Sequence, residues 1–345
     1  MPSVDLSIDI GIDLGTSAVK IFTPGRGVVL FEPSVVSIDK DTDGIISIGT
    51  KAYRMIGKTS DRIAAVYPLH GGVISDCELT EALLTEFVKK VCGTRVIMPR
   101  VVACVPNGVT EVERRAVVEA LRAAGARKVC LIDEVVAAAL GAGIDISLPY
   151  GSMVCDIGGG TTDIGVISLN GLSASDSLKV AGNTCDEAII KKIRKSYDLL
   201  IGPRTAEQIK KEIGCAFPRD RVMRGFVRGR DARSGLPRQV EITSDEIMDA
   251  LEEPCVYICR AVQGVLERTP PELVSDLYER GMMLTGGGAM LYGLDKLLSR
   301  KTRLNVLLAH DPQYCVVRGT GEALDYIDPR SEVEFAVSPL EVYSF

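Results

Sequence analysis

Two segments of this chain repeat the same order of short elements and carry an aspartate at the same place. Residues 8–32 read as an apolar strand, an LGTS turn, a second strand, a PGRG turn and a third strand. Residues 152–180 read as a strand, a GGGTT turn, a strand, an NG turn and a strand. Asp13 and Asp156 stand at the first turn of each segment, followed by glycine and hydroxyl residues. This repeat predicts two lobes of similar topology, each beginning with a three-stranded β-meander.

Local signals around the meanders predict an α/β fold with mixed sheets flanked by helices. The NG pair at 170–171 favours a hairpin turn with positive φ at both residues. Thr110 with Glu113, and Thr184 with Glu187, have the spacing of capping boxes at the starts of predicted helices. Strands alternate with these helices along the chain, which is typical of sheets packed against helices.

Composition limits the classes of protein to which the chain can belong. A length of 345 residues exceeds the size of most single cores, so two domains are expected. The formal net charge of −6 argues against general nucleic-acid binding. The 10 cysteines form no CxxC pair and only 2 histidines are present, so we expect no zinc site and a reducing cytosol. The sequence also lacks a secretory signal, a membrane-spanning apolar stretch, a P-loop and an opening GxGxxG motif.

A third glycine cluster, in residues 281–298, reads as strand, triple glycine and helix. An ordinary tight turn explains each glycine cluster taken alone, because glycine reaches positive φ without strain. Three such turns together, with backbone N–H groups open to an anion, suit a nucleotide held between two lobes. Asp13 and Asp156 then suit Mg²⁺, which is usually held by one or two carboxylates plus phosphates. The alternative is that both are solvated turn aspartates.

Three glycine-containing motifs stand at 13–17 (DLGTS), 156–163 (DIGGGTTD) and 284–291 (LTGGGAML). They resemble the two phosphate motifs and the adenosine motif of the actin-like ATPase superfamily. Five further segments look like the MreB family, the bacterial actins that direct rod-shaped wall growth. These segments are EPSVVSID at 32–39, TEVERRAV at 110–117, LLIGPRTAEQIKKEIG at 199–214, GRDARSGLPR at 229–238 and TPPELVSD at 269–276. The resemblance is colinear over most of the chain.

The resemblance implies an α/β, actin-like (ribonuclease H-like) two-lobed ATPase fold, with mixed five-stranded sheets flanked by helices and a cleft between the lobes. Lobe I would comprise residues 1–143 plus about 315–345, with subdomain IB inserted at about 33–75. Lobe II would comprise residues 144–314, with subdomain IIB inserted at about 183–245. The implied cofactors are ATP and Mg²⁺.

The resemblance also implies the site residues, matched motif by motif. Asp13 and Asp156 would hold Mg²⁺ through water, and Glu134, Thr161 and Asp163 would be the catalytic group that positions the attacking water. The nucleotide-binding residues would be Asp13, Gly15, Thr16, Ser17, Ala18, Lys20, Gly158, Gly159, Gly160, Thr161 and Thr162 near the phosphates, Glu207 and Lys210 at the ribose and base edge, and Gly286, Gly287, Gly288 and Ala289 at the adenosine.

Several residues depart from the family pattern or have a plain alternative. Val135 stands where the family has a proline after its catalytic glutamate, and Asp163 and Asn183 replace a glutamate and an aspartate. Lys20 stands where actin, but not the usual MreB, has a phosphate-contacting lysine; its alternative is an exposed strand lysine. Glu134 could also be a glutamate that simply favours a helix start. ATP binding therefore follows more directly than fast turnover.

The family further implies membrane contact and self-assembly. Val96, Ile97 and Met98 fall in the loop that inserts apolar side chains into the membrane, although they could equally begin a buried strand. The partners implied are the protein itself in paired protofilaments, the inner face of the cytoplasmic membrane, the cell-wall elongation machinery and a RodZ-type membrane adaptor, with no specific nucleic acid. The basic segment 219–233 is most simply a solvated face, with nucleic acid or anionic lipid as the alternative.

The function implied is that of a slow cytoskeletal ATPase, cytoplasmic and peripheral at the membrane, whose filaments scaffold wall synthesis and rod shape. A small-molecule kinase of the same superfold is the first alternative, and a slow nucleotide-gated adaptor without polymerisation is the second. A chaperone ATPase is disfavoured, because little chain follows the adenosine motif.

Overall fold

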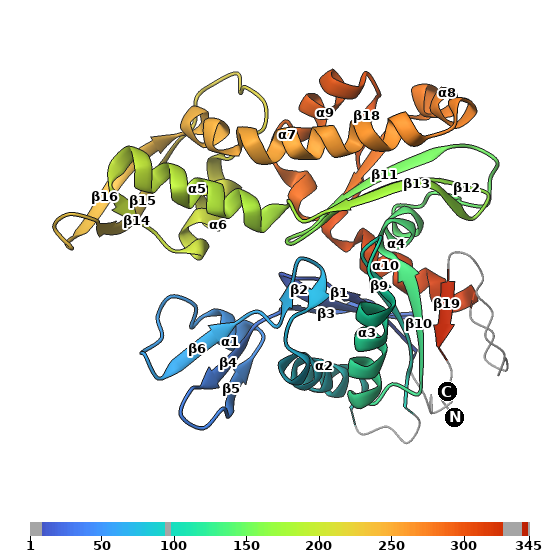
Figure 1. Ribbon diagram of the computed structural model, residues 1–345, viewed down its shortest axis with the longest axis horizontal. Helices are drawn as coiled ribbons and strands as arrows, with labels where there is room; N and C mark the ends of the chain where they lie inside the picture. The colour runs from blue at the N-terminus through green and yellow to red at the C-terminus, as the bar shows by residue number, and fades with distance from the viewer. Residues whose placement is uncertain (1–8, 94–97, 327–339, 344–345) are drawn as a thin grey trace.

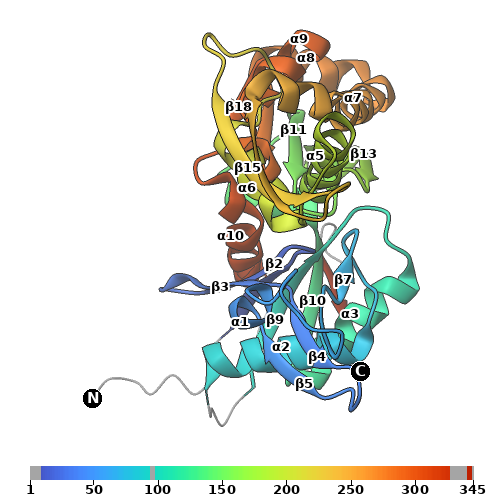
Figure 2. The same cartoon turned by 90° about the vertical axis from the view of Figure 1, so that its left-hand side faces the viewer.

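The computed structural model describes residues 9–93, 98–326 and 340–343. The chain forms two bodies, each built on one main sheet, and α4 (Glu134–Gly141) and α10 (Cys315–Glu322) lie where the bodies meet (Figure 1). Figure 2, turned by 90°, again shows α10 at this junction. No helix in these three ranges combines the length and apolar character that crossing a membrane requires.

The first body contains a six-stranded mixed sheet in the order β19-β10-β9-β1-β2-β3. Helices α2 and α3 share one hydrophobic core with one face of this sheet, and α4 and α10 pack on the other face. Along β9, Val101 and Ala103 face the first core while Val102 and Cys104 face the second, as the two-residue period of a strand requires. The elements are β1 (Ile10–Leu14), β2 (Ala18–Thr23), β3 (Gly27–Pro33), β9 (Arg100–Val105), β10 (Lys128–Asp133), β19 (Leu340–Tyr343), α2 (Cys77–Cys92) and α3 (Glu111–Ala123).

A smaller unit is inserted between β3 and α2. Its three-stranded antiparallel sheet has the order β5-β4-β6, and a two-stranded ribbon follows it. The elements are β4 (Val36–Asp39), β5 (Ile45–Ile48), α1 (Thr50–Tyr53), β6 (Ile63–Val66), β7 (Leu69–His70) and β8 (Val73–Ile74).

The second body contains a five-stranded mixed sheet in the order β13-β12-β11-β17-β18. A three-stranded sheet, β14-β15-β16, lies at one end of it beside α5 and α6 (Figure 1). The strands are β11 (Ser152–Ile157), β12 (Thr162–Ser168), β13 (Gly171–Leu178), β14 (Leu199–Leu200), β15 (Arg224–Asp231), β16 (Pro237–Thr243), β17 (Met282–Thr285) and β18 (Val306–Leu308). The helices are α5 (Gly182–Tyr197), α6 (Pro203–Ile213), α7 (Ser244–Arg268), α8 (Pro271–Arg280) and α9 (Leu294–Thr302), with 3₁₀ turns η1 (Gly288–Met290), η2 (Pro312–Tyr314) and η3 (Ala323–Tyr326).

The predicted repeat is present in the structure. Strands β1, β2 and β3 form one antiparallel meander, and β11, β12 and β13 form the other. The predicted α/β class with mixed sheets is confirmed, and β19 adds one strand to the five expected in the first body. The boundaries of the four subdomains stay predictions.

Two local predictions were wrong in detail. The hairpin after β12 turns at Leu169 and Asn170, which have φ of 51° and 62°, while Gly171 already begins β13. The NG signal therefore located the turn one residue too late, because pairing between Ser168 and Gly171 sets the register. Helix α5 begins at Gly182 rather than at Thr184, whose hydroxyl instead accepts a hydrogen bond from the Ala181 N–H at 3.4 Å. The capping box at Thr110 is confirmed.

The two junction helices cross at unusually close range. A Cβ added to Gly319 on α10 would lie 1.8 Å from the Ala137 carbonyl oxygen on α4, and one added to Gly141 would lie 1.8 Å from the Cys315 carbonyl oxygen. Only glycine permits this backbone contact. The two glycines therefore fix how closely the bodies approach each other.

Candidate nucleotide site

A cavity of about 510 Å³ opens where the two bodies meet, a size typical of small-molecule sites. Its walls include the first turn of each meander, the start of α4, part of α6 and the turn after β17. It therefore brings together all three glycine clusters of the sequence. The predicted residues that line it are Asp13, Gly15, Thr16, Ser17, Ala18, Lys20, Glu134, Asp156, Gly158, Gly159, Gly160, Thr161, Glu207, Lys210, Gly286, Gly287 and Gly288.

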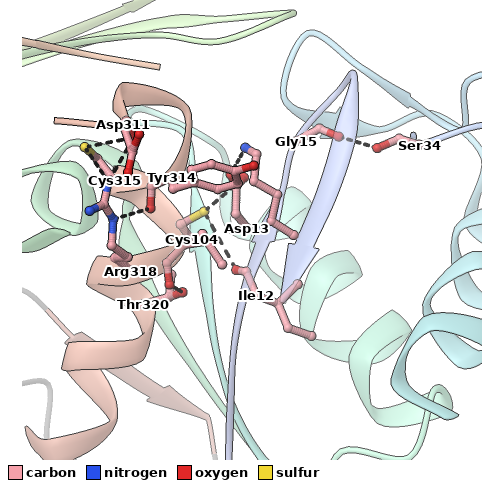
Figure 3. Close-up of polar contacts among 12 residues, drawn as sticks. Ile12, Asp13, Gly15, Ser34, Cys104, Asp311, Tyr314, Cys315, Arg318 and Thr320 are labelled. Carbon is pink, nitrogen blue, oxygen red and sulfur yellow. Dashed lines mark hydrogen bonds and ion pairs between the residues drawn. The ribbon is translucent and has the colours of Figure 1, made fainter. Parts of the chain in front are cut away.

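Asp13 lies near the end of β1 and is only 3% exposed. The β1–β2 register places Lys20 directly across from it, and the Lys20 ammonium lies 2.5 Å from its Oδ2. On the other side, the Cys104 thiol lies 3.9 Å from Asp13 Oδ1 and from the Ile12 carbonyl oxygen (Figure 3). Lys20 is therefore a half-buried partner of Asp13 and not an exposed strand lysine, which was the alternative for that residue.

Asp156 occupies the same place in the second meander and is 2% exposed. Its Oδ1 is buried and makes no hydrogen bond to any described residue. Burial raises the pKa of Asp156 to about 7, and the nearby charges of Asp13 and Asp163 act in the same direction. A cation beside this buried carboxylate would favour its ionised form, because opposite charge stabilises that form.

The glycines of the second meander allow the two first turns to pack against each other. A Cβ on Gly159 would lie 1.9 Å from the Ser17 hydroxyl oxygen, and one on Gly160 would lie 2.4 Å from the Thr16 hydroxyl oxygen. A hydrogen bond also joins the two bodies here, since the Ser17 hydroxyl donates to Asn183 Oδ1 at 3.2 Å. Because residues 158–160 are glycines, only backbone N–H groups and small hydroxyls lie at the point where phosphates are expected.

Glu134 is the first residue of α4, is buried and lines the cavity. Burial, and then the carboxylates of Asp163, Asp156 and Asp13, raise its pKa well above the ordinary range. Val135, which stands where the family has proline, is fully buried and packs beside Gly165 of β12. The helix start is therefore formed without that proline.

Glu207 and Lys210 lie on α6 and have partners within the protein. Glu207 accepts a hydrogen bond from the Tyr53 hydroxyl at 2.8 Å, which joins α6 to the inserted unit of the first body. Lys210 donates to the Gly182 carbonyl oxygen at 2.7 Å and pairs with Asp186 at 2.8 Å. The Tyr53–Glu207 contact spans the two bodies beside the cavity and was not predicted.

Some predicted residues lie outside the cavity wall, and some wall residues were missed. Thr162, Asp163 and Ala289 are buried and do not line the cavity. Asp163 sits across from Asp156 on β12 and accepts a hydrogen bond from the Asn107 N–H at 3.0 Å. The missed residues include Gly72, whose N–H donates to Thr16 Oγ1 at 2.9 Å. Other missed wall residues include Phe31, Gly182, Asp186, Lys211, Arg219 and Tyr292.

Of the predicted membrane residues, Val96 and Ile97 lie outside the described residues. Met98 is 43% exposed, and its terminal methyl lies over Gly125 at the end of α3. Membrane contact therefore stays a prediction.

Sequence comparison decides the family. The profile described as MreB/Mbl protein matches residues 7–332. The chain belongs to the MreB/Mbl family. It is 50% identical over 328 residues to the cell shape-determining protein MreB of Escherichia coli K12, covering 93% of this chain and 94% of that one. It is 47% identical to the cell shape-determining protein Mbl of Bacillus subtilis, covering 93% and 96%.

Solved structures agree with this assignment and show the actin-like fold. MreB5 of Spiroplasma citri bound to ADP has a TM-score of 0.89 and 39% identity, covering 93% of this MreB/Mbl chain and 97% of that chain. The same protein bound to AMPPNP has a TM-score of 0.88. A MamK double helical filament, at 22% identity and a TM-score of 0.79, shares the fold.

Proposed function

We propose that this protein binds ATP with Mg²⁺ in the cavity between its two bodies, hydrolyses it slowly and assembles into filaments that take part in cell-shape determination. The observation that carries the proposal is the convergence of the two meander turns on one cavity, with Asp13 from one body and Asp156 from the other. MreB5 of Spiroplasma citri, 39% identical to this chain, has been solved with ADP and with AMPPNP.

The residues present fit a divalent cation. Asp13 and Asp156 are buried carboxylates that line one cavity, and Asp156 Oδ1 has no hydrogen-bond partner among the described residues. Mg²⁺ prefers carboxylate oxygens and phosphates and keeps several waters. We assign Asp13 and Asp156 as the groups that would hold it, through water. The ion would supply positive charge that stabilises phosphate oxygens during phosphoryl transfer.

The protein's own part in hydrolysis is mostly positioning. The backbone N–H groups of Gly158, Gly159 and Gly160 and the hydroxyls of Thr16 and Ser17 would bind phosphate oxygens. Glu134 would orient the attacking water from the start of α4 and accept its proton. Burial, and then the neighbouring carboxylates, raise the pKa of Glu134 and so make its carboxylate a stronger base. Thr161 lines the cavity and would help Glu134 to orient the water. Asp163 does not line the cavity and would act indirectly, by helping to position Asp156, which lies across from it on the neighbouring strand.

At the sugar and base, Gly286, Gly287 and Gly288 would contact the adenosine and Glu207 the ribose. Gly286 has φ of 83°, and a Cβ there would lie 2.3 Å from the Ile157 carbonyl oxygen. Glu207 would have to share its carboxylate between the ribose and Tyr53. Ribose binding and contact between the bodies would therefore be linked.

Subunits of the filament would meet head to tail, a contact that does not close into a ring. We propose attachment to the inner face of the cytoplasmic membrane through the loop that contains Val96, Ile97 and Met98. Weak contacts of this kind add up along a polymer. A RodZ-type adaptor and the wall elongation machinery would be the further partners.

Two measurements test the proposal. Calorimetry with ATP and Mg²⁺ should give one site per chain, and Asp156→Ala should lose most of the affinity while Asp295→Ala, at an aspartate outside the cavity, should retain it. High-speed sedimentation should then show ATP-dependent pelleting, increased by anionic vesicles. The absence of any purine nucleotide affinity would refute the site, and a monodisperse protein with ATP across salt and lipid conditions would refute the filament.

A further inference from the structure

Lys20 lies in a line of three side chains that faces the nucleotide cavity. Strand pairing places Asp13 of β1 across from Lys20 of β2, and Lys20 across from Phe31 of β3. All three line the cavity, and the Lys20 ammonium lies 5.8 Å from the centre of the Phe31 ring. The lysine is thus held by a salt bridge on one side and an aromatic face on the other.

The second meander has an acid at the matching position. Lys20 follows Asp13 by 7 residues, and Asp163 stands in the same relation to Asp156. Both pairs lie across from each other on the first two strands of their meander. The first meander therefore pairs a carboxylate with an ammonium group, whereas the second pairs two carboxylates. Lys20 offsets part of the negative charge of these three carboxylates.

The other cationic side chains of the cavity wall are already engaged away from Asp13. Lys210 pairs with Asp186, Lys211 pairs with Glu207 at 2.6 Å, and Arg219 donates to the Gly214 carbonyl oxygen at 2.9 Å. The Lys20 ammonium is the group placed beside Asp13, where the phosphates and a divalent cation are expected. Its side chain is 15% exposed, so water screens its charge only weakly.

We infer that Lys20 is a counter-ion that neutralises part of the negative charge at Asp13 and the phosphates, as Mg²⁺ would, so that this protein binds a nucleoside diphosphate with little dependence on divalent cation. The inference rests on the proposed nucleotide site. Lys20 neutralises Asp13 when no metal is bound and offers a positive charge to the phosphates. When a cation arrives, the ammonium repels it, so the same lysine weakens Mg²⁺ binding.

This double effect separates a counter-ion from a residue that merely supports the fold. Loss of Lys20 weakens ADP binding without Mg²⁺ by on the order of tenfold or more, the loss expected when a charged group loses a hydrogen-bond partner. The same change strengthens Mg²⁺ binding to the ADP complex, because one repelling charge is removed. A purely structural role would weaken both.

The experiment measures the ADP dissociation constant in EDTA and in Mg²⁺ for the full chain, with Mg²⁺ affinity obtained by titrating the metal into the ADP complex. The variants are Lys20→Met, Lys20→Arg, which retains the charge, and Lys192→Met, which removes a half-buried lysine paired with Asp249 at 3.4 Å. Chelation should change the wild-type constant by less than about tenfold, and that of Lys20→Met by about tenfold more. Lys20→Arg should keep the low wild-type ratio of the two dissociation constants because it retains the charge, and Lys192→Met should behave as wild type.

A wild-type loss of more than about tenfold on chelation overturns the inference. So does a folded Lys20→Met protein whose ratio of ADP dissociation constants in EDTA and in Mg²⁺ equals that of wild type, or one whose ADP complex binds Mg²⁺ no more tightly than that of wild type. If Lys20→Met does not fold, Lys20→Gln, which also removes the charge, is measured in its place. Failure of wild type to bind ADP in either condition refutes the nucleotide site itself.

Discussion

The contact between α4 and α10 yields a prediction whose sign depends on tertiary structure. Replacing a helical glycine by alanine normally stabilises a helix by about 1 kcal/mol, because glycine has the greater backbone entropy when unfolded. At Gly319 the new Cβ would lie 1.8 Å from the Ala137 carbonyl oxygen. Ordinary contact needs about 3.5 Å, so the helices must separate by roughly 1.7 Å.

The magnitude follows from these two opposing effects. Overpacking of a rigid site typically costs about 1–3 kcal/mol, and contact with backbone favours the upper end because no side chain can rotate away. After subtraction of the gain in helix propensity, Gly319→Ala should lower the free energy of unfolding by about 2 kcal/mol. Gly264→Ala in α7 is the matched control, since its Cβ meets only the Arg268 Nη1 at 3.7 Å. That variant should gain about 0.5–1 kcal/mol.

The assay is equilibrium urea unfolding followed by circular dichroism, with all variants compared at one pH and without nucleotide. Gly319→Ala should also bind nucleotide more weakly, because α4 begins with Glu134 and α10 carries Val316, and both line the cavity. A Gly319→Ala protein as stable as Gly264→Ala would refute the argument that backbone contact between these helices sets the spacing of the two bodies.

Three further predictions concern the cavity and its edges. Tyr53→Phe removes the hydroxyl that donates to Glu207 across the two bodies, so a fluorescent ADP should dissociate about three- to tenfold faster. Tyr278→Phe, at an exposed tyrosine, should leave the dissociation rate unchanged. Equal rates in wild type and both variants would show that the Tyr53–Glu207 contact does not retain nucleotide. Glu134→Gln should keep ATP affinity within about threefold but slow phosphate release by about a hundredfold or more, and an unaffected rate would remove Glu134 from the mechanism. Burial raises the pKa of Asp156 to about 7 in the folded protein, above its unfolded value, so the stabilisation from protonating Asp156 is present at low pH and lost as pH rises towards and through 7. The urea midpoint of the nucleotide-free protein should therefore fall between pH 5 and pH 8, and Asp156→Asn should reduce that fall; a midpoint that rises over this range would contradict the assignment.

Much of the fold was predictable because its signals are local. The capping box at Thr110, the strand before Asp13 and the matching strand before Asp156 are set by residues close together in sequence. The errors arose where distant pairing overruled a local signal. Strand register moved the β12–β13 turn off Gly171, and Thr184 became the third residue of its helix and not its cap.

The chain by itself determined the two meanders, their paired aspartates and the three glycine turns, because each follows from side-chain pattern and backbone sterics over a few residues. Tertiary structure alone decided which groups meet: the Tyr53 hydroxyl with Glu207, the Gly72 N–H with Thr16, and Lys20 held between Asp13 and Phe31. These contacts depend on strand register and on the close crossing of α4 with α10. Neither can be read from neighbouring residues, since both are fixed only when the two bodies pack together.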